Sequence, residues 1–176
     1  MNQNGIALPR YSECLVCGNN NPSGFDITFY YRNGRIEADF IPQERHTGYQ
    51  NVVHGGLLAT LLDECMGWSS ILSRRVMCVA AELSVRYKVS AHVGDRLTVC
   101  GQLVADKKRI MLAQGEIVRD DGTVLCTGEG KFVPLPDEEQ RRVIDYAGWG
   151  KRLDEVHEAI QNMKPSESLM LRKNLC

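Results

Sequence analysis

The sequence lacks a long apolar run and an excess of charge of either sign. Its 176 residues include 21 Lys and Arg against 22 Asp and Glu, which gives a formal net charge of −1. No stretch reaches the roughly 18 consecutive apolar residues of a membrane-spanning helix. The basic excess that is typical of nucleic-acid-binding domains is also missing. We therefore expect neither a membrane nor a nucleic acid as a partner.

The amino-terminal end lacks the features of an export signal. Residues 1–5 contain neither a basic group nor an apolar run, so we expect no signal peptide. Seven cysteines are present, and most of them lie inside apolar segments, namely Cys65, Cys78, Cys100 and Cys126. A reduced cysteine in such a segment acts as a small hydrophobic residue. Together these observations predict a cytoplasmic protein.

Two strands are predicted near the beginning of the chain. Residues 24–31 and 35–41 have strand-like composition, and Asn33-Gly34 between them is the strongest short signal for a hairpin. Pro42 ends the second strand, because proline cannot donate a hydrogen bond to a sheet ladder.

One long helix is predicted over residues 53–73. Apolar and small residues recur there at helical spacing and cover roughly half of the helix surface, at ~100° per residue. These residues are Leu57, Leu58, Leu61, Leu62, Cys65, Met66, Ser69 and Leu72. A stripe this wide predicts a helix that is buried on much of its surface.

Four strand-like segments follow the helix, separated by short polar turns. They cover residues 77–91, 96–106, 110–119 and 124–135. Strands joined by short turns form an antiparallel sheet, and that sheet is the only large surface on which the helix can bury its stripe. The order β-β-α-β-β-β-β predicts an α+β protein of the hotdog type, in which a curved antiparallel sheet wraps around one long central helix.

A single domain with two flanking segments is expected. Residues 1–23 form an amino-terminal segment with a Cys-x-x-Cys pair, and residues 24–136 form the sheet-and-helix domain. Residues 137–176 are a charged, helical appendage with too few apolar residues for a core of its own. Its amphipathic helix is expected over residues 152–163.

The start of the long helix, His54-Gly55-Gly56, is the first candidate for a functional site. Two glycines there cost roughly 1 kcal/mol each relative to alanine. The first N–H groups of a helix have no partner within it, and without side chains a ligand oxygen can approach them. The helix dipole would favour negative charge at that point. Close packing of the helix end against a strand explains the glycines equally well.

Asp63 is the second candidate. On a helical wheel it lies opposite the apolar stripe, within about 20° of Gly56 and two turns further on. Its neighbours on that face, among them Thr60, are small, and aspartate is a poor residue for a helix interior. The pattern indicates a cleft, with a solvated polar face as the alternative. Glu64, about 100° away, ranks second as a carboxylate.

The two candidates belong to a longer motif. It reads His46-Thr47-Gly48-Tyr49-Gln50-Asn51-Val52-Val53-His54-Gly55-Gly56 and continues from Leu57 to Asp63. This motif resembles the signature of the PaaI-like acyl-CoA thioesterases. The resemblance extends over about residues 14–135 and includes Cys14-x-x-Cys17-Gly18, Asn21-Pro22-x-Gly24, residues 82–87 and Gly94-Asp95.

The resemblance implies an enzyme that hydrolyses acyl-CoA thioesters with a medium-chain or aromatic acyl group. It implies a homodimer, or a homotetramer, with active sites between the subunits. The backbone N–H of Gly55 or Gly56 would polarise the thioester carbonyl, and Asp63 of the facing subunit would attack it or activate a water. His54 would have a structural more than a catalytic role. No metal and no organic cofactor are implied.

Two positions depart from the family pattern and keep other functions open. Gly48 stands where some relatives carry an asparagine that contacts the thioester, and Ala80-Ala81 stand where relatives often carry a serine or threonine. We expect substrate contacts from nearby polar residues, namely His46, Gln50, Asn51, Thr60, Glu64 and Ser84. The departures favour a non-catalytic acyl-CoA-binding protein, which Asp63 opposes. An acyl-thioester dehydratase fits poorly, because its chemistry usually needs a histidine paired with a carboxylate.

Basic residues and the first two cysteines complete the candidates. Five basic residues could meet the phosphates of CoA, namely Arg86, Lys88, Lys107, Lys108 and Arg109. For the last three, a solvated turn is the alternative. Cys14 and Cys17 look like half of a zinc knuckle, but no second pair follows at matching spacing. We therefore expect a tight turn there and no metal site.

Overall fold

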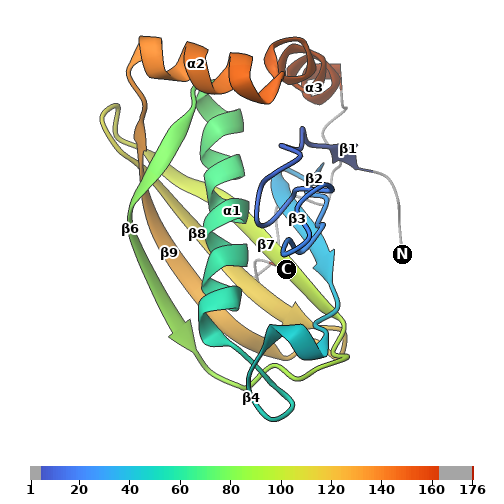
Figure 1. The fold of residues 1–176 in the computed structure, drawn as a ribbon. Coiled ribbons are helices and arrows are strands. Elements are labelled where there is room, and N and C mark those ends of the chain that lie inside the picture. Colours follow the sequence, from blue (N-terminus) through green and yellow to red (C-terminus); the bar gives the residue numbers. More distant parts are fainter. Residues whose placement is uncertain (1–4, 163–175) are drawn as a thin grey trace.

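A computed structural model describes residues 5–162 and Cys176 (Figure 1). Its central element is helix α1 (Gly55–Arg74), which packs against one face of a seven-stranded sheet. The order of the strands across the sheet is β1-β2-β3-β7-β8-β9-β6, and all neighbouring pairs are antiparallel. The predicted hotdog fold is confirmed.

The strands before α1 are short. They are β1 (Ile6–Ala7), β2 (Tyr30–Arg32) and β3 (Arg35–Phe40), followed by the 3₁₀ helix η1 (Glu44–His46) and a separate hairpin of β4 (Thr47–Tyr49) and β5 (Val52–Val53). Strands β2 and β3 join at Asn33 and Gly34, whose φ angles are 49° and 81°. Positive φ at both central positions is what a tight hairpin turn requires.

Strand β2 is shorter than the predicted strand over residues 24–31. The reason is that the chain before Tyr30 bonds to the amino-terminal segment instead of to β3. The N–H groups of Phe25 and Ile27 donate to the carbonyls of Leu15 and Val16. The composition of this stretch indicated extended backbone correctly but not its partner.

Four long strands after α1 form the main part of the sheet. They are β6 (Cys78–Tyr87), β7 (Leu97–Asp106), β8 (Met111–Arg119) and β9 (Val124–Pro134). Each matches one predicted segment. Strand β6 ends at Tyr87 instead of at residue 91, because the N–H groups of Lys88 and Val89 both turn to the carbonyl of Leu125.

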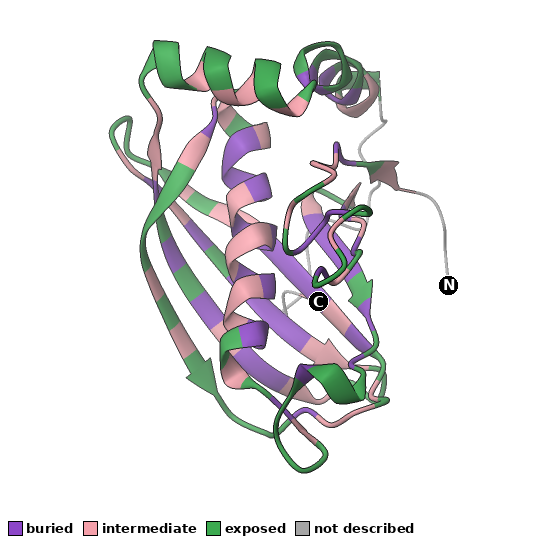
Figure 2. Cartoon of the chain, viewed as in Figure 1, coloured by how far each residue is buried: buried purple, intermediate pink, exposed green. Residues whose placement is uncertain are grey.

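Three glycines allow α1 to lie close to the sheet. Gly101, Gly115 and Gly128 are neighbours across β7, β8 and β9. A Cβ atom at Gly101 would lie 2.9 Å from the backbone of Cys65, and one at Gly128 would lie 3.2 Å from Leu62 Cδ1. The side of α1 that faces these strands is fully buried (Figure 2), as the width of its apolar stripe predicted.

Two helices follow the sheet, where one was predicted. They are α2 (Asp137–Ala147) and α3 (Gly150–Asn162). Helix α3 covers the predicted helix over residues 152–163 except for residue 163, which lies outside the described residues. Helix α2 has recognisable signals, since Pro136 precedes three acidic residues in its first turn and Gly148, at φ 65°, follows its end. No helix in the described part of the chain is both long and apolar enough to cross a membrane.

Trp149, between α2 and α3, connects the carboxyl-terminal helices to the rest of the core. Its ring centroid lies 5.3 Å from that of Trp68 in α1, and its Nε1 donates to the carbonyl of Arg10 at 3.1 Å. Leu153 and Val156 of α3 are buried as well. These helices therefore share the apolar core of the sheet and α1.

Cys100 of β7 forms a disulfide with Cys176. This bond corrects the expectation that Cys100 is a reduced apolar residue. The free cysteines among the described residues are Cys14, Cys17, Cys65, Cys78 and Cys126. Because disulfides are rare in reducing compartments, cysteine usage no longer supports a cytoplasmic location, which stays a prediction.

Candidate active site

Helix α1 begins at a cap made by His54. The Nδ1 atom of His54 accepts a hydrogen bond from the N–H of Gly56 at 2.9 Å, and its carbonyl accepts one from Leu57 at 3.0 Å. An accepting Nδ1 places the proton of a neutral ring on Nε2. His54 thus satisfies one of the unpaired donors of the first turn, which is a structural role.

This cap leaves Gly55 as the open donor at the start of α1. Among the described residues, the N–H of Gly55 has no hydrogen-bond acceptor, whereas that of Gly56 is bonded to His54. The carbonyl of Gly55 accepts a hydrogen bond from the hydroxyl of Tyr87 at 2.8 Å. A Cβ atom at Gly55 would lie 3.3 Å from the Tyr87 ring, so close packing against a strand also applies.

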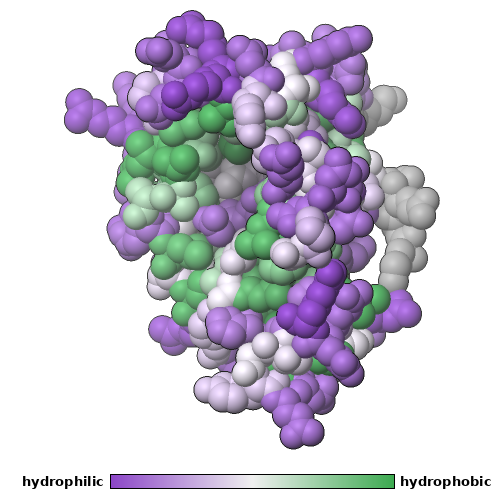
Figure 3. Space-filling model, in the orientation of Figure 1, coloured by the Kyte–Doolittle hydropathy of each residue, from purple (hydrophilic) through white to green (hydrophobic). Residues whose placement is uncertain are grey.

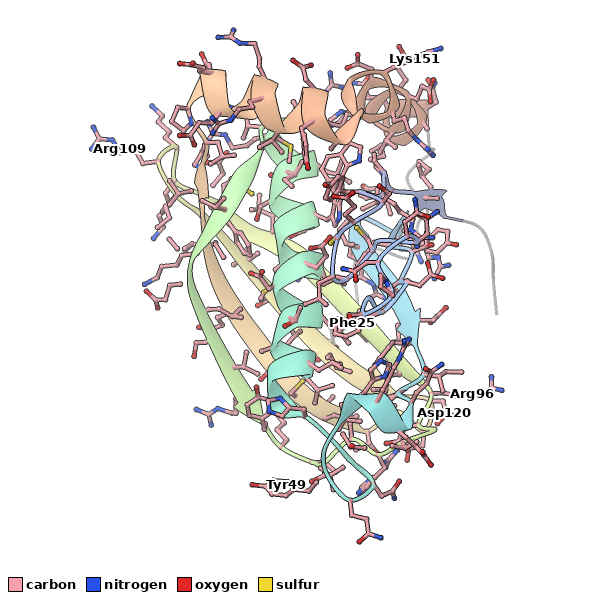
Figure 4. All side chains as sticks on the ribbon, viewed as in Figure 1. Phe25, Tyr49, Arg96, Arg109, Asp120 and Lys151 are labelled. Atoms are coloured by element: carbon pink, nitrogen blue, oxygen red, sulfur yellow. A yellow bond between two sulfur atoms is a disulfide. The ribbon has the colours of Figure 1, made fainter. Side chains whose placement is uncertain are left out.

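A cleft of about 340 Å³ opens beside Gly55. Its walls are the β4–β5 hairpin, the first turn of α1 and the chain after β6, with lining residues that include Gly48, Val52, Leu58, Tyr87, Lys88 and Ser90. Tyr49, which is 82% exposed, also lines the cleft and extends from the hairpin near the start of α1 (Figure 4). A cleft at the positive end of a helix is suited to an oxygen that carries partial negative charge.

Gly48 is close to the cap. A Cβ atom there would lie 3.1 Å from His54 Cδ2 and 3.2 Å from His54 Cα. A side chain at this position would require the hairpin or the His54 ring to shift. The structure therefore offers no amide at the place where the resemblance led us to look for one.

Asp63 lies about two turns further along α1 than Gly55. At a rise of 1.5 Å per residue, the two are about 12 Å apart along the helix axis. Asp63 does not line the cleft beside Gly55. One chain therefore does not bring the predicted base and the predicted donor together.

The carboxylate of Asp63 has an unsatisfied oxygen. Its Oδ1 is buried without a hydrogen-bond partner among the described residues, and burial raises the pKa of Asp63 above its usual range. The hydroxyl of Thr60 is not available to it, since that group donates to the carbonyl of Gly56 at 2.9 Å. Burial and, to a lesser extent, the Asp63 charge raise the pKa of Cys78 in β6 to about 12.

Strand β6 is an edge of the sheet and is ten residues long. Most of its residues are exposed (Figure 2), including Val79 at 50% and Tyr87 at 52%. Figure 3 shows hydrophobic side chains gathered on the left of the view, over β6 and beside α1. A long exposed edge strand with apolar side chains is a surface for pairing with another chain.

Glu64, the next residue after Asp63, faces the amino-terminal segment. Its carboxylate and the Sγ atoms of Cys14 and Cys17 all lie within 4.8 Å of one another. Burial, and to a lesser extent the nearby Cys14, raises the pKa of Glu64 to about 7, while hydrogen bonds from Cys17 and Trp68 act in the opposite direction. This position does not support the expected substrate contact, because Glu64 does not line the cleft.

His46 is a buried residue of the core. Its Nδ1 accepts a hydrogen bond from the N–H of Gln43 at 2.9 Å, and its Nε2 accepts one from Arg45 Nε at 3.2 Å. The ring packs against those of Phe25 and Phe40, and burial lowers the pKa of His46. Both ring nitrogens are engaged within the chain, so the contact of His46 with the substrate stays a prediction that this geometry does not favour.

Ser84 and Arg86 lie on the face of the sheet that points away from α1. They are paired in register with Glu129 and Thr127 and border a polar surface hollow with them. Side chains alternate along a strand, and the intervening Val85 packs against the core. Within one chain Ser84 and Arg86 lie away from the cleft, and their contacts with the substrate stay predictions.

The other basic residues divide between two ends of the molecule. Lys88 lines the cleft beside Gly55. Lys107, Lys108 and Arg109 form the β7–β8 turn near the far end of α1, where Arg74 donates to the carbonyl of Lys108 at 2.6 Å. Figure 4 shows Arg109 and the cleft-side Tyr49 at opposite ends. Within one chain, only Lys88 can meet a ligand in the cleft.

Gln50 and Asn51 lie at the exposed tip of the β4–β5 hairpin and do not line the cleft. Asn51 has a φ of 61°, which asparagine tolerates in a tight turn.

Tyr87 lines the cleft, although the sequence did not identify it as a candidate site residue. Its place at the end of an alternating strand does not reveal that its hydroxyl reaches the first residue of α1.

Residues 50–126 match the family model described as the thioesterase superfamily. The matched segment contains α1, with both Gly55 and Asp63, and the residues that line the cleft except Gly48 and Tyr49. A comparison with curated proteins finds no match.

Solved structures with the same fold include several thioesterases. The thioesterase superfamily protein RHA08564 is 27% identical, with a TM-score of 0.65, covers 69% of this chain, and is itself matched over 60% of its length. PaaI of E. coli, from the phenylacetic acid degradation operon, is 19% identical over 64% of this chain and 81% of its own, with a TM-score of 0.59. The smu.793 protein of Streptococcus mutans, bound to acetyl CoA, is 21% identical over 60% and 84%, with a TM-score of 0.56.

Over residues 50–126 the chain is therefore similar to the thioesterase superfamily, and it has the fold of the solved thioesterases. The fold that it shares with PaaI is consistent with the PaaI-like group that the motif predicted.

Proposed function

We propose that the protein hydrolyses acyl-CoA thioesters to a free acid and CoA. The observation that carries this proposal is the Asp63 carboxylate, whose buried Oδ1 has no partner among the described residues. It lies on a helix whose first residue offers an open N–H donor beside a cleft. The match of residues 50–126 to the thioesterase superfamily supports thioester hydrolysis in general, and two proteins of the same fold were solved with acetyl CoA and with coenzyme A.

The active site is shared by two copies of the chain. Gly55 and Asp63 are about 12 Å apart along one helix, and a base must lie within hydrogen-bond reach of the atom it serves. Two chains that pair through their β6 edges would place their α1 helices side by side. If the two helices run in opposite directions, Gly55 of one chain faces Asp63 of the partner subunit. The exposed apolar residues of β6 support this homodimer.

The chemistry needs few groups, because a thioester is already a reactive acyl donor. The Gly55 N–H, at the positive end of α1, donates to the carbonyl oxygen and stabilises the charge that develops there. Asp63 of the partner subunit takes a proton from a water molecule, whose oxygen adds to the carbonyl carbon. The carbon–sulfur bond then breaks, and the thiolate of CoA leaves and is protonated. Direct attack by the carboxylate, followed by hydrolysis of the anhydride, is the other route to the same products.

The remaining cleft residues hold this arrangement. His54 and Tyr87 fix the first turn of α1 by bonding to the N–H of Gly56 and the carbonyl of Gly55. Lys88 lies where it can meet a phosphate of CoA. Since His54 occupies the Gly56 N–H, Gly55 is the oxyanion donor of the proposed site.

A second candidate function is binding of acyl-CoA without hydrolysis. Two observations favour it. A side chain at position 48, where some relatives carry an amide, would crowd His54, and the Gly56 N–H is already bonded. Both reduce the number of polar groups that can reach the thioester carbonyl.

A panel of medium-chain and aromatic acyl-CoAs, followed by free-thiol release, tests the proposal. We expect release by the wild type and loss of release in D63A and D63N. S84A is the matched control, because Ser84 lies on the far face of the sheet. Tight acyl-CoA binding without thiol release by the wild type would establish the second function instead. An enoyl chromophore from 3-hydroxyacyl substrates would point to a dehydratase.

Mixed dimers test the shared site. D63N keeps Gly55, and G55V keeps Asp63 but closes the approach to the N–H with a branched side chain. Each variant alone should be inactive, whereas co-expressed mixed dimers should recover thiol release from the one site that has both groups. Failure of the mixture, with each variant folded and dimeric by light scattering, would contradict the shared site.

A further inference from the structure

We propose that Cys14, Cys17 and Glu64 bind a zinc ion, with water as the fourth ligand. The three ligand atoms, two sulfurs and a carboxylate oxygen, already lie within 4.8 Å of one another. Around a tetrahedral zinc, with Zn–S of about 2.3 Å and Zn–O of about 2.0–2.2 Å, neighbouring ligand atoms are roughly 3.5–4 Å apart. Small side-chain rotations therefore close the site without a change of fold.

The turn that carries the two cysteines is shaped to hold a thiolate. The N–H groups of Val16 and Cys17 point at Cys14 Sγ, at 3.3 Å and 3.5 Å. Hydrogen bonds donated to sulfur stabilise its charged form, which is the form that binds a metal. Gly18 closes the turn, and a Cβ atom there would lie 2.3 Å from the carbonyl oxygen of Cys14. The backbone thus holds both sulfurs on one side of a tight loop.

The third ligand comes from a different part of the chain. Glu64 projects from the middle of α1 toward this turn, 47 residues beyond Cys17 by their numbering (64 − 17). No metal site was expected from the sequence, because no second cysteine pair follows Cys14 and Cys17 at matching spacing. A carboxylate that reaches the pair through the fold leaves no spacing signal, so only the structure can supply it.

Charge gives an independent reason for a cation at this place. Among the described residues, no Lys, Arg or His forms an ion pair with Glu64. A largely buried carboxylate beside two sulfurs needs a compensating positive charge or must stay protonated. A divalent ion provides that charge. Thiolate ligands favour zinc over magnesium or calcium, which prefer oxygen.

A zinc ion here would tie the amino-terminal segment to α1. Cys17 and its neighbour Val16 are buried in the core, and the carbonyl of Val16 accepts a hydrogen bond from the N–H of Ile27. The metal would hold this segment at the residue that follows Asp63, and so fix the turn of the helix that carries the proposed base. Each thiol that becomes a ligand releases one proton to solvent.

Direct metal binding by the full-length protein tests this proposal. The protein is stripped with a chelator under reducing conditions and titrated with Zn²⁺ in competition with a chromogenic chelator. We expect one zinc ion per chain. Co²⁺ in place of zinc should give a thiolate-to-metal charge-transfer band and the visible bands of a tetrahedral site. Both signals report on the ligands and not on activity.

Variants identify the ligands. C14S and C17S should abolish binding, and E64Q should weaken it at least about tenfold. C78S is the matched control, because Cys78 is another partly buried thiol of the described chain and should leave zinc binding unchanged. Circular dichroism establishes that each variant is folded. If C14S or C17S is unfolded, E64Q and the Co²⁺ spectrum of the wild type decide.

Three outcomes would overturn the proposal. The first is less than about 0.1 zinc per chain in the reduced wild type. The second is zinc binding that survives E64Q and both cysteine variants, or that is lost equally in C78S. The third is a disulfide between Cys14 and Cys17 that persists under reductant, as seen by intact mass.

Discussion

Asp63 and Glu64 are adjacent carboxylates on one helix, and their surroundings differ almost completely. Both have a raised pKa, and burial is the largest cause in each case. Asp63 has a buried oxygen without a partner among the described residues, and its charge contributes to the raised pKa of Cys78 in the edge strand β6. Glu64 is turned toward two sulfur atoms of the amino-terminal segment.

Burial alone therefore does not assign a role to a carboxylate. A helix presents neighbouring residues about 100° apart, so two acids in succession reach different parts of the fold. We propose that Asp63, whose buried oxygen has no partner among the described residues, serves a substrate. We propose that Glu64, which lies beside two sulfur atoms, serves a metal. Each assignment depends on the partners of the group and not on its titration.

The largest effect on the rate of thiol release should come from replacing Asp63, with the same replacement of Glu64 as the comparison. D63N should lower the rate of thiol release by about 10²–10⁴-fold, because the base is lost while the shape is kept. E64Q should lower it less than about tenfold, because Glu64 lies outside the cleft. Steady-state kinetics on one acyl-CoA measures both. Equal losses in the two variants would mean that the two acids act as one unit.

The pH dependence of stability should separate the same pair. A raised folded-state pKa means that the protonated form is favoured in the folded protein. The contribution of Glu64 to the free energy of unfolding is complete below its pKa in the unfolded chain, about 4.3. It is lost as the pH rises through its pKa in the folded protein, about 7. In metal-free protein, E64Q should gain on the wild type by roughly 1–2 kcal/mol between about pH 4 and pH 8.

For Asp63 the sign is the same and the window begins at lower pH, since its pKa is raised from an ordinary value of about 3.9. D63N should therefore separate from the wild type at more acid pH than E64Q does. Urea unfolding at a series of pH values measures both curves. A wild type that loses stability relative to E64Q as pH falls would reverse the sign and contradict the burial of Glu64.

Variants at the start of α1 should change the kinetics of thiol release, which depend on Asp63, and should leave zinc binding by Glu64 unchanged. H54A removes the cap of the Gly56 N–H, and Y87F removes the bond to the Gly55 carbonyl. Each should lower the free energy of unfolding by about 1 kcal/mol and raise KM or lower kcat for acyl-CoA. Zinc affinity should not change in either variant. A parallel loss of zinc would show that the two sites are coupled along the helix.

The smallest effect should come from a charge at the rim of the cleft. K88A should raise KM for acyl-CoA about 2–5-fold, the size expected for one exposed ion pair, and the effect should shrink at high salt. K108A is the matched control, because Lys108 lies near the opposite end of α1. A larger effect of K108A would place the CoA phosphates near the β7–β8 turn, which only another subunit could supply.

The fold was predictable because its signals are local and periodic. The stripe of α1 and the alternation of the strands after it repeat over many residues, and Asn33-Gly34 specifies its turn by backbone conformation. The shortening of β2 was not predictable, since Phe25 and Ile27 bond to a segment that has no pattern of its own. Helix α2 had cap signals at Pro136 and Gly148, but most of its residues are polar and none of them is buried.

The candidate site was predictable only as a set of residues. Sequence placed Gly55 and Asp63 on one helix, but it could not show that His54 occupies the neighbouring N–H. The expected substrate contacts were chosen from polar residues because they lie close to the motif in the sequence. In the structure the side chain of His46 points into the core, and that of Ser84 points to the far face of the sheet. The local geometry of the turn and of the strand sets these directions, and closeness in the sequence does not report it.

The distance between α1 and the sheet is set by a row of three glycines, Gly101, Gly115 and Gly128. Each missing side chain lets the helix backbone and its large residues sit where a methyl group would otherwise lie. A methyl group at Gly101 would lie 2.9 Å from the backbone of Cys65, so α1 would have to move away from the sheet there, and Asp63 and Glu64 would move with it. The proposed chemistry should therefore be sensitive to a mutation that lies outside the cleft.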